Sequence, residues 1–109
     1  MNKIMVSGNL VDAPSSITLP SGVTMTKFVV AVNSIYKNAD GERTTQFMNV
    51  IAWRGLAETC TKFLNKGSKV LVCGEAQNRK YQNDKGETKY VFEIVADEIE
   101  FLDSKKKEE

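Results

Sequence analysis

Apolar and polar residues alternate along most of the chain, which is the pattern of half-buried β-strands. Val, Ile and Phe dominate the alternating stretches, and no proline interrupts them. Turn-forming residues separate them, first in a hairpin-like segment from Pro14 to Gly22 and later in the sequences NADGE and NDKG. The pattern therefore predicts five strands, which fall within residues 3–11, 26–35, 44–53, 68–81 and 87–102.

The spacing of apolar residues changes once, between the third and fourth predicted strands. Apolar side chains there recur every three or four residues, at Leu56, Ala57, Cys60, Phe63 and Leu64. Gly67 follows as a candidate C-cap. This segment predicts one helix of about three turns.

Three strands, one helix and two strands follow one another in the order of an OB-fold, a small Greek-key barrel. The predicted fold class is all-β, a five-stranded OB-fold barrel with one α-helix between strands three and four. We expect one domain, residues 1–102, and a flexible charged tail, residues 103–109, which has no apolar residue. Four phenylalanines lie in apolar runs and are predicted core residues: Phe28, Phe63, Phe92 and Phe101.

Composition is that of a globular protein, with 41% hydrophobic and 27% charged residues among 109. No apolar run approaches the length of a membrane span, and no signal-peptide core follows the N-terminus, so we expect a cytoplasmic protein without membrane contact. Two isolated cysteines, Cys60 and Cys73, are expected to be reduced, small, buried hydrophobes.

The net charge of +1 conceals an uneven distribution along the chain. Residues 1–92 carry 12 Lys and Arg against 7 Asp and Glu, whereas residues 93–109 carry 3 against 7. A polyanion responds to the charge within about a Debye length, ~8–10 Å, so the basic body suits nucleic acid. Ordinary solvated faces are the alternative interpretation.

An enzymatic function is not expected. The chain has no histidine, no Gly-rich phosphate loop, and no partner that would activate either cysteine. The acidic residues near the end, Glu93, Asp97, Glu98 and Glu100, are interpreted as a solvated strand face rather than a cation site. We therefore predict no metal and no cofactor.

Four large rings lie where a nucleic acid could reach them. Phe47 and Trp53 share one strand face with Asn49 and Ile51, because side chains alternate across a strand. Tyr36 and Tyr81 lie at strand ends beside basic residues, at Lys37 and at Arg79 and Lys80. Rings with adjacent cations suit single-stranded nucleic acid. Core or cross-strand packing remains the alternative for each ring.

Several motifs occur in an order that resembles the bacterial single-stranded DNA-binding protein family: NKIMVSGNL, TKFVVAVN, AWRGLAE, FLNKGSKVLVCGE, RKY with DKGETKY, and EIVAD. The resemblance extends from Asn2 to about Leu102. It implies an OB-fold that usually assembles as a homotetramer. It also implies sequence-independent binding and protection of single-stranded DNA in replication, recombination and repair.

The resemblance assigns base stacking to Tyr36, Phe47, Trp53 and Tyr81. Cations on loops and strand ends are the candidate phosphate contacts: Lys37, Arg43, Arg54, Lys62, Arg79, Lys80, Lys85 and Lys89. The apolar N-terminal strand adds a candidate subunit contact, so we expect a dimer at minimum.

Two departures from the family pattern affect the expected partners. The family's acidic C-terminal tip is absent and the chain stops at KKKEE, so recruitment of replication proteins through that tip is not expected. A short member borne by a plasmid, phage or mobile element and a truncated chain both fit this ending. Met48 replaces a histidine often found near a subunit contact. The alternative function is an OB-type protein-interaction module of a primosome-like assembly.

Overall fold

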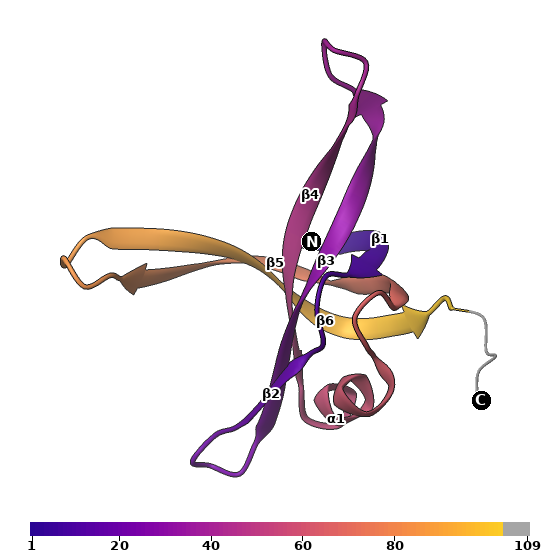
Figure 1. The fold of residues 1–109 in the computed structure, drawn as a ribbon. Coiled ribbons are helices and arrows are strands. Elements are labelled where there is room, and N and C mark those ends of the chain that lie inside the picture. Colours follow the sequence, from indigo (N-terminus) through magenta and orange to yellow (C-terminus); the bar gives the residue numbers. More distant parts are fainter. Residues whose placement is uncertain (104–109) are drawn as a thin grey trace.

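The structure is a computed structural model that describes residues 1–103, and the described residues form six strands and one helix (Figure 1). Their bounds are β1 Ile4–Leu10, β2 Ser15–Thr18, β3 Thr24–Lys37, β4 Arg43–Trp53, α1 Arg54–Phe63, β5 Lys69–Gln82 and β6 Thr88–Phe101. The predicted tail, apart from its first residue, lies outside the described residues.

Five strands close into a barrel. The strand order is β1-β5-β6-β4-β3-β2, and β1 also pairs with β3 through Asn9↔Ala31 and Leu10↔Val30. The β4–β6 pair is parallel, and the other pairs are antiparallel. Helix α1 joins β4 to β5, the third and fourth strands of the barrel. The predicted OB-fold with one helix is confirmed.

The segment predicted as hairpin-like contains a strand of its own. β2 pairs with the start of β3 from Ser15↔Lys27 to Thr18↔Thr24. Gly22 has a φ of +90° in the connecting turn, a conformation that glycine adopts without steric cost. This short strand extends the sheet beside the barrel and does not take part in its closure.

The barrel interior is filled mainly by β-branched side chains. Val30, Val50, Val72 and Ile94 have no exposed surface, and each stabilises the fold by roughly 1.5–3 kcal/mol through burial. Helix α1 contributes buried side chains from Ala57 and Cys60.

Barrel closure depends on a close approach at Gly8. A Cβ atom at this position would overlap the carbonyl of Ala31 on β3, next to the two residue pairs that join β1 to β3. A similar approach occurs at Gly74, which follows a register shift in β5 and faces the carbonyl of Val95. Glycine allows the strands to cross at both places.

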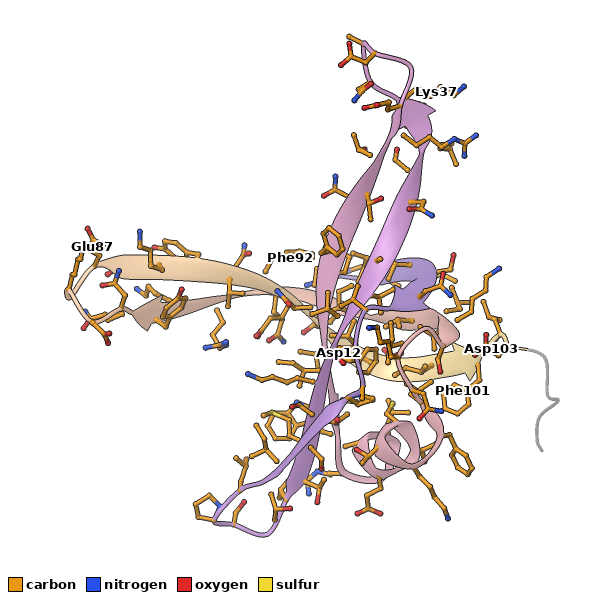
Figure 2. The ribbon with its side chains drawn as sticks, in the orientation of Figure 1. Asp12, Lys37, Glu87, Phe92, Phe101 and Asp103 are labelled. Carbon is orange, nitrogen blue, oxygen red and sulfur yellow. The ribbon has the colours of Figure 1, made fainter. Side chains whose placement is uncertain are left out.

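Three of the four predicted core phenylalanines are not core residues. Phe28 is buried, but Phe63 is 57% exposed, and Phe92 and Phe101 are each 41% exposed. Phe63 ends α1 and packs against Phe101, with 6.3 Å between ring centroids. Phe92 belongs to the part of β6 that pairs with β5 but not with β4, near the base of the β5–β6 hairpin (Figure 2).

The helix ends before Gly67, which the sequence predicted as its C-cap. Leu64 is the C-cap, in extended conformation, and its N–H donates to the carbonyl of Cys60 at 2.9 Å. Gly67 lies in a separate turn with a φ of +90°, where its N–H donates to the carbonyl of Leu10. Gly67 therefore joins the helix exit to the end of β1 and does not cap the helix.

Candidate nucleic-acid interface

Two long hairpins project from the barrel in different directions, one formed by β3 and β4 and the other by β5 and β6 (Figure 1). They are called the β3–β4 arm and the β5–β6 arm below. Lys37 and Glu87 lie near their outer ends (Figure 2). The arms carry long stretches of strand beyond the core, so their side chains can contact a long ligand.

Both arms end in the same turn. In the β3–β4 arm, the side-chain oxygen of Asn38 accepts the backbone N–H of Asp40 at 2.9 Å and of Glu42 at 3.0 Å. In the β5–β6 arm, Asn83 accepts the N–H groups of Lys85 and Glu87 at 2.9 and 3.0 Å. These asparagine-centred bonds follow from the related sequences NADGE and NDKGE.

A tyrosine precedes each turn by two residues. Tyr36 is 76% exposed and Tyr81 is 45% exposed. The residue pairs Lys37↔Arg43 and Tyr81↔Lys89 place cations across the strands beside these rings. The turn chemistry that the sequence indicated thus leaves an accessible ring next to positive charge at both tips.

The two β4 rings lie nearer the barrel. Phe47 is 63% exposed and Trp53 is 37% exposed. Asn49 and Ile51 lie between them on the same face of the strand, whereas Val50 and Ala52 on the other face are fully buried. The predicted shared face of Phe47, Asn49, Ile51 and Trp53 is open only in part, because Ile51 is itself 7% exposed.

The β5–β6 arm has two different faces. Arg79 pairs with Val91 and Tyr81 with Lys89 on one face, and Lys80 pairs with Tyr90 on the other. The structure therefore separates Arg79 from Lys80, which the sequence placed together. Tyr90 is 69% exposed, and the sequence analysis missed it because a ring inside an alternating strand is usually a packing residue.

Arg79 is held by a buried carboxylate. Its Nε donates to Oε1 of Glu93 at 3.1 Å, and its Nη2 donates to Oε2 at 3.0 Å. Glu93 is 5% exposed, so the expectation that it belongs to a solvated acidic face is wrong. The hydrogen bond and the charge of Glu93 raise the pKa of Arg79. The pairing also leaves three of the five guanidinium N–H donors unused by Glu93.

The other predicted phosphate contacts lie on several elements. Arg54 starts α1 directly after Trp53, with a φ of +58°. Lys62 lies over the ring of Phe63, with its Nζ 5.6 Å from the centroid. The Nζ of Lys89 lies 3.8 Å from Oε1 of Glu87. Lys37, Arg43 and Lys85 are exposed at the arm ends, so the cations do not form one compact cluster.

A pocket of about 440 Å³ opens on the face that carries Phe47 and Trp53. Its apolar lining includes Val29, Ile51 and Val91. The polar lining includes Lys27 and Asn49, together with the Arg79–Glu93 pair. Sequence reasoning could not identify this pocket because its walls come from strands far apart along the chain.

A closed five-stranded barrel with one helix between its third and fourth strands defines the OB-fold class, whose members bind oligonucleotides or oligosaccharides. The chain belongs to the single-strand binding protein family, whose family model matches residues 1–102. Among residues 1–103, no helix combines the length and apolar character needed to cross a bilayer.

The chain is similar to named relatives over most of its length. It is 42% identical over 105 residues to the single-stranded DNA-binding protein 1 of Staphylococcus aureus strain MSSA476, a match that covers 96% of this chain and 67% of the relative. It is 40% identical over 105 residues to the single-stranded DNA-binding protein 3 of Listeria innocua, covering 96% and 66%. The chain thus spans about two thirds of the length of these relatives.

Proposed function

We propose that the chain binds single-stranded DNA without sequence preference by stacking bases on four exposed rings: Tyr36, Phe47, Trp53 and Tyr81. Membership of the single-strand binding protein family supports the binding of single-stranded DNA, with roles in replication, recombination and repair. The main observation in support of stacking is that all four rings, on the arms and on β4, are at least 37% exposed. Each stacked base contributes roughly 1–3 kcal/mol and requires no particular base identity.

Cations at strand ends and loops hold the phosphates in this proposal. They are Lys37, Arg43, Arg54, Lys62, Arg79, Lys80, Lys85 and Lys89. Their distribution over both arms and α1 suits a strand that wraps around the protein, because a wrapped strand meets phosphates over its full length. Lys80 faces away from Tyr81, and Lys62 lies over the ring of Phe63 on α1. These two lysines would therefore contact more distant parts of the bound DNA.

The test compares two exposed phenylalanines. Phe47→Ala should weaken binding of oligo-dT by about 1–3 kcal/mol, because one stacking ring is removed. Phe63→Ala is the matched control, since Phe63 is similarly exposed at 57% but lies at the end of α1. Affinity is measured by fluorescence anisotropy with labelled oligo-dT and unlabelled duplex as competitor. Equal affinities for the two variants, or efficient competition by duplex, would contradict the proposal.

We also propose that the protein acts as an oligomer, a symmetric dimer at minimum and a homotetramer in its full assembly. Among residues 1–103, β1 pairs with β5 from Ile4 to Asn9 and with β3 only at Asn9 and Leu10, so residues 4–8 have one edge without a strand partner. Met5 on this segment is 61% exposed. An unpaired apolar edge favours association with another strand, and a second copy supplies one.

We further propose that the protein works on DNA in the cytoplasm, as a nucleoid-associated protein.

Light scattering tests this assembly. A monomeric molar mass at micromolar concentration, with or without oligonucleotide, would exclude it. Met5→Lys should lower the molar mass, because a charge on the free strand edge opposes pairing with a second copy. Ile17→Lys is the matched control on β2, where the side chain is also exposed.

A further inference from the structure

The pocket on the open face lies among the proposed stacking rings. Asn49 and Ile51 form part of its lining and are placed between Phe47 and Trp53 on β4. Arg79 and Val91 line another wall and pair with each other across the β5–β6 arm, two residues from the Tyr81↔Lys89 pair. A strand that stacks on both Phe47 and Trp53 along β4 would therefore run past the pocket.

The apolar part of the pocket suits a flat heterocycle. Val29, Ile51 and Val91 come from three different strands and meet at this pocket. Ile51 is 7% exposed, so its side chain already lies well below the surface. The volume of about 440 Å³ is at the small end of the range typical of ligand pockets.

The charged side chains that line the pocket balance one another: Lys27 and Arg79 against Asp12 and Glu93. Glu93 is nearly buried, and both its oxygens accept bonds from Arg79, so the guanidinium charge is already neutralised at the wall. Asp12 contributes a second carboxylate near the centre of the molecule, away from the arm tips (Figure 2). The lining therefore carries no net charge, which suits a neutral base better than an anionic phosphate.

The polar groups suit the edge of a base. Asn49 donates from Nδ2 to the carbonyl of Phe92 at 3.4 Å, and its amide oxygen points to no other group within hydrogen-bond distance among the described residues. An amide and the ammonium group of Lys27 together offer both an acceptor and a donor. Uncharged bases carry both kinds of group on their edges.

We infer that this pocket takes one nucleobase of the bound strand, with Val29, Ile51 and Val91 against its face and Asn49 at its edge. The inference rests on the proposed function and deepens it, because it adds a buried base site to the open stacking rings. Phosphates on either side of that base remain outside the pocket, where exposed cations can contact them.

The direct test is nuclear magnetic resonance of the wild-type protein with oligo-dT. Intermolecular contacts should appear between thymine protons and the methyl groups of Val29, Ile51 and Val91, and the side-chain amide of Asn49 should shift. If oligo-dT binds and perturbs Phe47 and Trp53 while these methyl groups show no contact with thymine, the pocket inference is wrong and the proposed function stands. If oligo-dT does not bind, both fail.

A filling variant gives an independent measurement. Val91→Phe should weaken binding of oligo-dT by roughly fivefold or more, the loss expected when one base can no longer be held. Leu102→Phe adds the same ring at an exposed position after β6, outside the pocket lining, and should leave the affinity unchanged. Unchanged affinity in a folded Val91→Phe protein would overturn the inference. If Val91→Phe does not fold, the magnetic resonance result on the wild type decides.

Discussion

Trp53 is the only tryptophan, so its fluorescence reports on one position of the proposed interface. The indole is 37% exposed at the end of β4, and its cross-strand partner Met25 is almost buried. The ring therefore has one accessible part that a base can cover and another part that packs on the protein. Stacking there should contribute about 1–3 kcal/mol, a change of roughly five- to 150-fold in affinity.

The assay is a fluorescence titration. Oligo-dT should quench the emission saturably, because a stacked base contacts the indole directly. Added salt should reverse much of the quenching, since each phosphate contact on a single strand contributes a slope of about −0.7 in a plot of log affinity against log salt. Duplex DNA of equal phosphate content should quench far less, because its bases are already stacked.

Two substitutions separate stacking from packing. Trp53→Phe keeps an aromatic face and should retain affinity within a few-fold. Trp53→Leu keeps apolar packing but removes the aromatic face, so it should lose roughly fivefold or more. Emission that does not change while anisotropy shows binding, or a folded Trp53→Leu protein with wild-type affinity, would refute the assignment of Trp53 to the interface.

Three further predictions follow from individual residues. Burial raises the pKa of Cys60 from 9.0 to about 11, so the unfolded thiol ionises first and the free energy of unfolding should fall by about 2 kcal/mol between pH 9 and 11; urea denaturation of wild type and Cys60→Ala should differ in this slope. Gly8→Ala should destabilise the barrel by about 1–3 kcal/mol through overlap with Ala31, while Gly55→Ala, which has open space in α1, should not, as thermal melting will show. Arg79→Ala should make the salt slope of oligo-dT binding less steep by about 0.7, and an unchanged slope would mean that Arg79 contacts no phosphate.

Much of the candidate site was predictable because local chemistry controls it. Asparagine and glycine in the sequences NADGE and NDKGE form the arm turns through bonds within five residues, so Tyr36 and Tyr81 had to lie just before a turn. Alternation along β4 likewise placed Phe47 and Trp53 on one face. In each case the determining contacts are close in sequence.

The errors concern residues whose surroundings come from distant parts of the chain. Glu93 looked like a solvated carboxylate, but β4 and β5 flank it and Arg79 neutralises it. Phe92 looked like a core residue, yet its part of β6 pairs with β5 but not with β4, and the ring remains exposed. Periodicity predicts which face of a strand a side chain occupies, but it does not predict whether another layer covers that face.

The sequence by itself determined the order of strands, the single helix, the turn positions and the rings beside them. Those features depend on backbone preferences and on hydrogen bonds between near neighbours. The tertiary structure alone decided the burial of Glu93, its pairing with Arg79 and the pocket beside Asn49. Each of these requires strands distant in sequence to meet in one register, which only closure of the barrel establishes.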